Sequence, residues 1–450
     1  MVLSSFPAGA QEFASDSAVR VILGGRIGAR RGMGFVVAAL ERGKPPRIYT
    51  AGISGIAGLP LDSNTVFEIG SITKVFTTSL LADMVARGEV KLDDPVSKFL
   101  PRGVRVPSRG GKHITLEHLA TQTSGLPRLP SNLRVVDQQN PYASYTVDEL
   151  YQFLSTFALT RDPGSQYLYS NLGMGLLGHV LALRAGKSYE TLLKERILDP
   201  LGMNDTRIEL TPAMKSRMAQ GFSSVGEPVK AWDLPTLAGA GALRSTAADM
   251  LRFLAASLDS TSHPLGRVLA QARKPRHDAD VPRNRIGLGW NIVEVFGTTA
   301  TWHNGGTGGF RAFIGIDEPR QRGVILLANA SVVPDDIAFH LLEPKVPLDL
   351  APAPTRPGPE IALDAAKLEA FPGTYEISPD LRITITKEGA ALFAQGTNQP
   401  RFRLYAESET KFFLRDADAQ ITFVKDASGK VSELILHQGG ANIPGKRVAP

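Results

Sequence analysis

The most regular pattern of apolar and polar positions covers residues 71–87, where apolar side chains recur every three to four residues. The apolar stripe consists of Ile72, Val75, Phe76, Leu80 and Met84. This spacing predicts an amphipathic helix, and Gly88 predicts its C-terminal end. A second helix is predicted over about 172–185, a segment rich in Leu and small residues.

Two short apolar runs, at residues 34–39 and 323–328, are bounded by Gly or polar residues and predict buried strands. Helix-like and strand-like segments alternate along the chain from about residue 15 to 345. The length of 450 residues favours one large domain, which we place at 15–350, together with a smaller one.

The pattern changes after a proline-rich segment at 351–361, which has four prolines in its first nine residues and predicts an extended linker. Residues 362–450 contain short segments with period-two alternation, such as 382–387 and 401–405. Alternation of this kind, with Gly-containing turns, predicts a small antiparallel sheet or barrel.

Composition narrows the function classes. The formal charge is +6, from 50 Lys and Arg against 44 Asp and Glu, and the basic residues are scattered, so we expect no nucleic-acid partner. The chain has no cysteine, which excludes disulfides and thiolate metal sites, and no stretch with the apolar length of a membrane span. Ala8, Gly9 and Ala10 have the small-x-small pattern of a signal-peptide cleavage site, which favours a periplasmic or secreted protein over a cytoplasmic one.

The first candidate for chemistry is Ser71 with Lys74. Residues three apart on a helix share one face, and Ser71 falls at the predicted helix N-terminus, where unpaired N–H groups favour negative charge. A Lys whose pKa is lowered by burial can take the proton of a serine nucleophile. The alternative is that Ser71 only caps the helix and Lys74 is a surface residue.

Two further elements carry suitable groups. Tyr169 offers a phenol that can transfer protons, and Asn171 offers an amide that can hold a lysine or a substrate. Alone, this pair is equally typical of a loop tyrosine and a helix cap. The segment 302–310 contains four glycines, which allow a backbone to approach a ligand closely, and one of its N–H groups could form an oxyanion hole with the N–H of Ser71.

The order of these elements, SxxK at 71–74, YxN at 169–171 and His-x-Gly at 303–305, resembles the penicillin-recognising serine hydrolases. More narrowly, the chain looks like the group of class C β-lactamases, D,D-carboxypeptidases, D-aminopeptidases and family VIII carboxylesterases. Further matching segments are 67–70, 92–96, 123–127 and 200–203. The resemblance covers about residues 15–345.

The resemblance implies an α+β fold, with a five-stranded antiparallel sheet covered by helices and joined to an all-helical part. It implies that Ser71 is acylated, that Lys74 activates it, and that Tyr169 is the general base and acid. The tail, 362–450, resembles the small lipocalin-like β domain that follows some of these hydrolases.

By the same resemblance, Asn171 contacts the substrate, His303 and Gly305 stand in the third motif, and Gly306 offers the second oxyanion N–H. The class C β-lactamases have Lys-Thr-Gly in this motif, whereas this chain has His303-Asn304-Gly305. A mostly neutral His weakens the expected grip on a β-lactam carboxylate. The departure therefore favours esters or D-amino-acid peptides over efficient β-lactam hydrolysis.

The leading interpretation is a serine hydrolase that acts through an acyl-enzyme on carboxylic esters or on β-lactam or amide bonds. The alternatives are a D-stereospecific peptidase and, from another class, a non-catalytic protein that binds cell-wall peptides or acyl compounds. We expect no cofactor and no metal, because His113 and His118 flank Glu117 without the spacing of a zinc motif. A homo-oligomer is compatible with the sequence.

Overall fold

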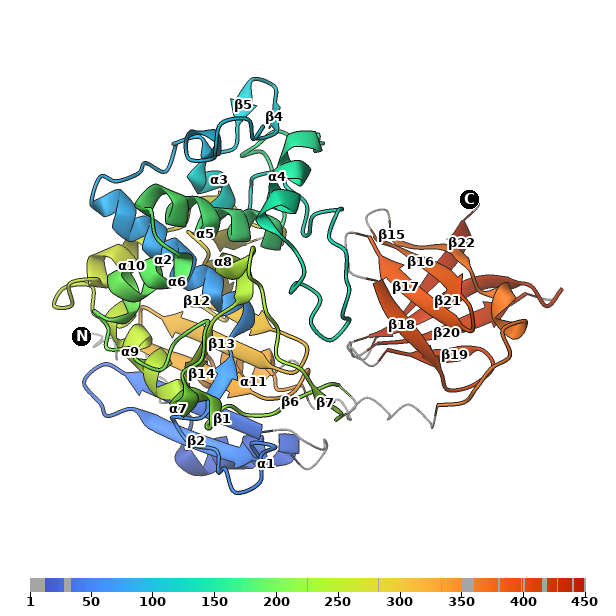
Figure 1. Cartoon of the computed structure of the whole chain (residues 1–450). Helices are drawn as coiled ribbons and strands as arrows, with labels where there is room; N and C mark the ends of the chain where they lie inside the picture. The colour runs from blue at the N-terminus through green and yellow to red at the C-terminus, as the bar shows by residue number, and fades with distance from the viewer. Residues whose placement is uncertain are drawn as a thin grey trace, which may run out of the picture.

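The computed structural model divides the chain into a large mixed domain and a C-terminal β-barrel (Figure 1). It describes residues 13–27, 34–224, 226–281, 283–332, 334–349, 360–378, 381–397, 399, 401–414, 419–426, 428–438 and 441–448. The small-x-small segment 8–10 and nearly all of the predicted linker lie outside the described residues. In the described part of the chain, no helix has the length and apolar character needed to cross a membrane.

An antiparallel sheet of eight strands forms the centre of the large domain, in the order β2-β1-β14-β13-β12-β11-β10-β9. The resemblance implied five strands. The sheet is wider because β2 pairs with β1 at one edge, while two short strands continue the sheet beyond β11 at the other. The strands are β1 (Gly34–Glu41), β2 (Arg47–Gly52), β9 (His277–Asp278), β10 (Asn284–Ile286), β11 (Asn291–Val295), β12 (Thr298–Gly306), β13 (Arg311–Asp317) and β14 (Arg322–Ala328).

Both faces of this sheet are covered by helices, which explains why the predicted strands read as continuous apolar runs. On β1, Val37 packs into a cluster with helices α1 (Asp16–Ile27) and α11 (Asp335–Leu342). Its neighbour Val36 points to the opposite face and belongs to the main core, shared with the helical part of the domain. The predicted strands at 34–39 and 323–328 are therefore confirmed as β1 and β14.

The helix predicted at 71–87 is formed by a short 3-10 turn, η1 (Gly70–Ile72), that leads into α2 (Thr73–Ala86). The predicted helix is confirmed, but it is not amphipathic, because every residue from Thr73 to Met84 is buried and α2 runs through the core. The second predicted helix is confirmed as α5 (Asn171–Ala185), which packs beside α2 and α8 (Ala238–Gly241).

The remaining helices and short strands surround α2 and α5 and complete the helical part. The helices are α3 (Leu116–Ala120), α4 (Val147–Thr156), α6 (Tyr189–Leu193), α7 (Pro212–Lys215), α8 (Ala238–Gly241), α9 (Ala247–Leu258) and α10 (Gly266–Ala272), with turns η2 (Val96–Lys98) and η3 (Lys194–Leu198). The short strands are β3 (Val66–Glu68), β4 (Ser108–Arg109), β5 (Lys112–His113), β6 (Gly221–Phe222), β7 (Pro228–Val229) and β8 (Arg244–Thr246).

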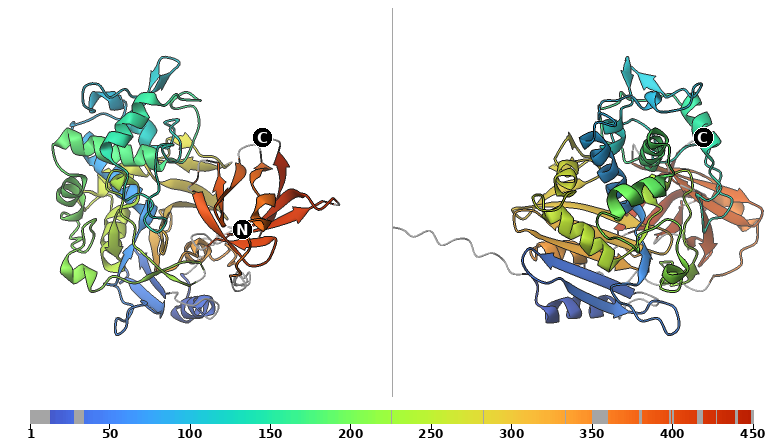
Figure 2. Two further views of the ribbon diagram at one scale, coloured as in Figure 1. Left: turned by 45° about the vertical axis from the view of Figure 1, so that its right-hand side comes forward. Right: turned by 60° about the vertical axis from the view of Figure 1, so that its left-hand side comes forward.

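The C-terminal domain is a closed barrel of eight antiparallel strands, as the period-two pattern predicted. Its interior is filled by side chains that include Phe371, Tyr375, Phe412 and Phe423. Figures 1 and 2 show the barrel at one side of the large domain, next to the loop of residues 126–146. It consists of η4 (Lys367–Ala370), β15 (Gly373–Ser378), β16 (Leu381–Glu388), β17 (Ala391–Gly396), β18 (Arg401–Ala406), β19 (Lys411–Phe413), β20 (Ala419–Lys425), β21 (Val431–Gln438) and β22 (Ala441–Val448).

Candidate active site

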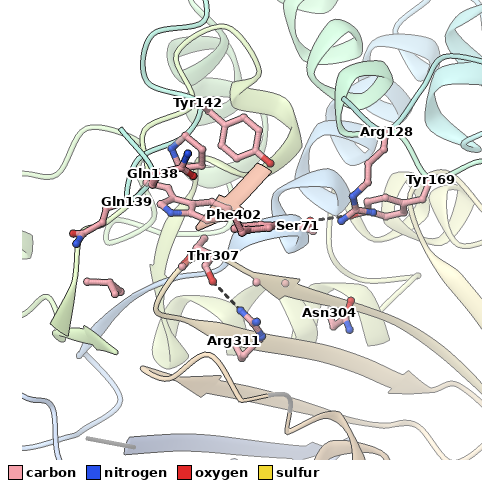
Figure 3. Close-up of a pocket in the computed structure, with 16 residues that line it drawn as sticks. Ser71, Arg128, Gln138, Gln139, Tyr142, Tyr169, Asn304, Thr307, Arg311 and Phe402 are labelled. Atoms are coloured by element: carbon pink, nitrogen blue, oxygen red, sulfur yellow. Dashed lines mark hydrogen bonds between the residues drawn. The ribbon is translucent and has the colours of Figure 1, made fainter. Parts of the chain in front are cut away.

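Ser71 lies in the η1 turn, at the seam between the sheet and the helical part. Its hydroxyl does not cap the helix, because neither η1 nor α2 begins with a side-chain cap. Instead, Ser71 Oγ lies 2.8 Å from Lys74 Nζ and 2.8 Å from Tyr169 Oη, whose phenol donates to it (Figure 3). The structure thus brings together the three residues that the sequence analysis selected for chemistry.

Lys74 is fully buried and is not a surface residue. Its Nζ donates to the backbone oxygen of Ala240 at 2.7 Å and lies 4.9 Å from the centroid of the Tyr169 ring. Burial, followed by the nearby positive charge of Arg128, holds the pKa of Lys74 well below its usual range. A lysine in this environment can be neutral and accept a proton from Ser71 across the same 2.8 Å contact.

The pKa of Tyr169 is raised, whereas that of Lys74 is lowered. Burial raises the pKa of its phenol to about 12, although the hydrogen bond to Ser71 and the charge of Arg128 both act to lower it. Tyr169 therefore keeps its proton at neutral pH. A neutral phenol at hydrogen-bond distance from the nucleophile can donate a proton to a leaving group.

Gly306 has a backbone N–H close to the η1 turn that carries Ser71. Thr307 N donates to Phe310 O at the end of the β12–β13 hairpin, so the next pair, Gly306 and Arg311, is a non-hydrogen-bonded pair. The Gly306 N–H therefore points away from β13, and β11 pairs with β12 only as far as Trp302. This arrangement directs the N–H of Gly306 towards η1.

The contact between β12 and η1 depends on glycine. A Cβ on Gly70, which has φ +49°, would lie 2.6 Å from Gly306 N, and a Cβ on Gly305 would lie 1.9 Å from Ile69 O and 3.0 Å from Ser71 N. Only residues without a side chain allow this approach. The N–H groups of Ser71 and Gly306 can consequently act together as an oxyanion hole.

His303 lies behind the cavity and does not line it. Its side chain is 3% exposed, and its ring centroid is 6.5 Å from that of Tyr169. Burial, and then the proximity of Lys74, lowers the pKa of His303 to about 3, so the ring is neutral. Its Nδ1 lies at hydrogen-bond distance from the backbone oxygen of Asn304, which assigns the proton to Nδ1.

Asn171 is also set back from the cavity. It begins α5 near Tyr142, whose pKa is raised by burial and lowered to a smaller extent by the charge of Arg128 and by the interaction with the Asn171 side chain. Its Oδ1 is buried and has no hydrogen-bond partner among the described residues. Asn171 thus supports Tyr142, a residue that does line the cavity.

The cavity in front of Ser71 has a volume of about 440 Å³ and contains several groups that the sequence analysis missed (Figure 3). Arg128 follows the matched segment 123–127, and Asn304 and Arg311 flank the glycines of the third motif, so proximity to the motifs could have indicated them. Tyr142 and Trp232 come from loops with no pattern of their own. Phe402 comes from the barrel, and no sequence signal connects it to the site.

Two carboxylates, one buried and one partly buried, support this cavity from behind. Glu68 Oε1 accepts from the backbone N–H of Trp232 at 2.8 Å and pairs with Arg244. Asp335 accepts a hydrogen bond from Asn304 Nδ2, and burial raises the pKa of Asp335 to about 6. Within the described residues, His, Asp and Glu form no cluster of three or more that could hold a metal ion.

Comparisons with known proteins identify the families that the two domains match. Residues 18–342 match the beta-lactamase family, and residues 358–447 match a family described as a domain of unknown function. A beta-lactamase from Pseudomonas fluorescens is 29% identical over 66% of this chain and 88% of its own length. The D-alanyl-D-alanine-carboxypeptidase/endopeptidase AmpH from Escherichia coli K12 is 31% identical over 60% of this chain and 72% of its own length.

The fold also has solved counterparts. The crystal structure of a beta-lactamase/D-alanine carboxypeptidase from Pseudomonas syringae superposes with a TM-score of 0.65 at 23% identity, over 74% of this chain and 99% of its own. The likeness at that identity concerns the fold alone, whereas the family match covers most of the chain. The chain therefore belongs to the beta-lactamase family of serine hydrolases.

Proposed function

We propose that this protein hydrolyses carboxylic esters through an acyl-enzyme on Ser71. The observation that carries the proposal is the pair of 2.8 Å contacts from Ser71 Oγ to a buried lysine and to a protonated tyrosine. Neutral Lys74 takes the proton of Ser71 as the hydroxyl attacks the ester carbonyl. The resulting oxyanion accepts hydrogen bonds from the N–H groups of Ser71 and Gly306.

Collapse of the tetrahedral intermediate breaks the bond to the alkoxide leaving group. Tyr169 donates its proton to that oxygen, and the proton on Lys74 restores the phenol through the shared contact with Ser71. Water then attacks the acyl-enzyme with neutral Lys74 as its base, and the proton passes from Lys74 to Ser71 Oγ as the acid is released.

The neutral state of His303 supports an ester over a β-lactam. A pKa of about 3 leaves no positive charge at the third motif, where the class C β-lactamases have a lysine. Hydrolysis of a D-amino-acid peptide with a free carboxylate is the second candidate, because the guanidinium groups of Arg128 and Arg311 line the cavity and could bind the carboxylate. The relative named as a D-alanyl-D-alanine-carboxypeptidase also supports this second candidate.

The decisive experiment compares turnover of a short-chain p-nitrophenyl ester, a chromogenic cephalosporin and a D-Ala-D-Ala peptide by the wild type and by Ser71→Ala. Ester turnover that disappears in Ser71→Ala, with slow or no cephalosporin hydrolysis, supports the proposal. Turnover of the peptide alone would replace it with the D-peptidase. Failure of all three substrates, with no labelling of Ser71 by a fluorophosphonate, would favour a binding protein.

Export to the periplasm or the medium belongs to the same proposal. It is motivated by the small-x-small pattern at 8–10. Mass spectrometry of the mature N-terminus from the native host tests it, and a mature protein that retains Met1 would contradict it.

A further inference from the structure

Phe402 is the only residue of the described barrel that lines the cavity in front of Ser71. It is the second residue of β18, opposite Ala394 of β17, and it is partly buried, with contacts to the barrel core. The later inward residues of β18, Leu404 and Ala406, are buried inside the barrel. Phe402 therefore stands at the barrel rim, where one side of its ring faces the core and the other side faces the catalytic cavity.

Besides Tyr169, two aromatic residues of the large domain line the same cavity. Tyr142 and Trp232 contact each other edge to face, with ring centroids 5.4 Å apart and an interplanar angle of 63°. Both are held from behind: Tyr142 by Asn171, and the Trp232 backbone by Glu68. With Phe402, three aromatic side chains besides Tyr169 thus line one cavity, and such surfaces favour apolar and aromatic groups.

The chemistry at Ser71 decides which part of the substrate reaches these rings. The leaving group must face Tyr169, which protonates it, so the acyl group extends to the opposite side of Ser71. Figure 3 shows Tyr169 on one side of Ser71 and Tyr142 with the neighbouring Gln138 and Gln139 on the other, and Phe402 lies in the view between Ser71 and these residues.

We infer that Phe402 is a specificity-determining residue, by which the C-terminal barrel completes an acyl subsite for aromatic or bulky apolar groups. The inference rests on the proposed function and extends it, since it gives the barrel a part in substrate selection. The barrel acts here as a wall of the active site, and its own interior is filled by aromatic side chains.

The test uses the full chain and two esters with the same leaving group, p-nitrophenyl acetate and p-nitrophenyl phenylacetate. Phe402→Ala should lower the ratio of kcat/KM for the phenylacetate to kcat/KM for the acetate about tenfold. The matched control is Phe393→Ala, which removes a phenylalanine from the paired strand β17 whose ring stacks on Arg401 and does not line the cavity. An unchanged ratio between the two esters in Phe402→Ala, or an equal change in Phe393→Ala, would overturn the inference.

A second measurement does not depend on turnover. Because the chain has no cysteine, Phe402→Cys and Phe393→Cys can each carry a single bimane label. Contact with Trp232 should quench the label at position 402, Trp232→Phe should restore its fluorescence, and the label at position 393 should not respond. An unquenched label at position 402 would overturn the inference, whether or not the wild type hydrolyses the two esters. Failure of the wild type to hydrolyse either ester would count only against the proposed function.

Discussion

The guanidinium carbon of Arg128 lies 4.9 Å from the centroid of the Tyr169 ring, which places a positive charge beside the contact between Ser71 and Lys74. After burial, this charge is the second cause of the lowered pKa of Lys74. Since Lys74 must be neutral to accept a proton, activity rises with pH through the pKa of Lys74. Replacing Arg128 with Gln should raise that pKa and shift the acidic limb of the pH profile of kcat/KM to higher pH.

The control for this variant is Arg134→Gln, in the same loop. Arg134 is exposed and does not line the cavity, so its removal should leave the pH profile in place. A purely structural effect of Arg128→Gln would lower activity at every pH by the same factor. Superimposable normalised profiles of the wild type and Arg128→Gln would therefore remove Arg128 from the electrostatics of the site.

Tyr169→Phe tests the phenol itself. The ring and its contacts with Lys74 and Arg128 are retained, and only the hydroxyl that donates to Ser71 is lost. Without the proton donor, turnover of an ester of an aliphatic alcohol, whose alkoxide must be protonated to leave, should fall on the order of a hundredfold or more. Tyr151→Phe, which removes a hydroxyl bonded to His179 away from the cavity, should be close to wild type. Equal rates for Tyr169→Phe and wild type would exclude Tyr169 from the mechanism.

The SxxK and YxN motifs predicted that Ser71, Lys74 and Tyr169 lie together, because local geometry fixes the position of each of these groups. Ser71 and Lys74 share a helix face by their spacing, and Tyr169 directly precedes the Ser170 cap of α5. Arg128 and Phe402 could not be predicted in this way. The conformation of a loop places Arg128 at the site, and the position of the C-terminal barrel places Phe402 there. The spacing of apolar residues along the chain predicts neither arrangement.

The fold was predictable where buried side chains recur at a regular spacing along the chain. It was not predictable where burial depends on contacts with residues that are distant in the sequence. The alternation of Val36 and Val37 between two cores explains why β1 was recognised as a buried strand. The apolar stripe at 71–87 predicted the helix. It did not predict that the polar residues between the apolar ones are also buried. Thr77 and Thr78, for example, donate to the backbone oxygens of Gly239 and Leu288 inside the core. These partners are distant in the sequence and invisible to a local pattern.

Gly305→Ala tests the approach of β12 to the nucleophile. A Cβ at 1.9 Å from Ile69 O cannot be accommodated without separating β12 from η1, which moves the N–H of Gly306 away from the oxyanion. Loss of one such donor lowers kcat by about 10²–10³-fold, and we expect kcat for the ester to fall within this range. Gly24→Ala, at a position on α1 where a Cβ meets nothing within 4 Å, should retain wild-type activity. Activity of Gly305→Ala near that of Gly24→Ala would contradict an oxyanion hole at this place.

Asp335 gives a prediction for stability against pH. Burial raises its pKa in the folded protein to about 6, above the ordinary value of 3.8, while it accepts a hydrogen bond from Asn304. A raised folded-state pKa favours folding at low pH, and this contribution is lost as pH rises from about 4 to 6. Asp335→Asn retains an acceptor for Asn304 and removes the buried charge. Relative to wild type, it should therefore gain up to about 3 kcal/mol of unfolding free energy between pH 4 and pH 7. Urea unfolding of both proteins across this range measures the difference, and a difference that does not change with pH would show that Asp335 has an ordinary pKa in the folded state.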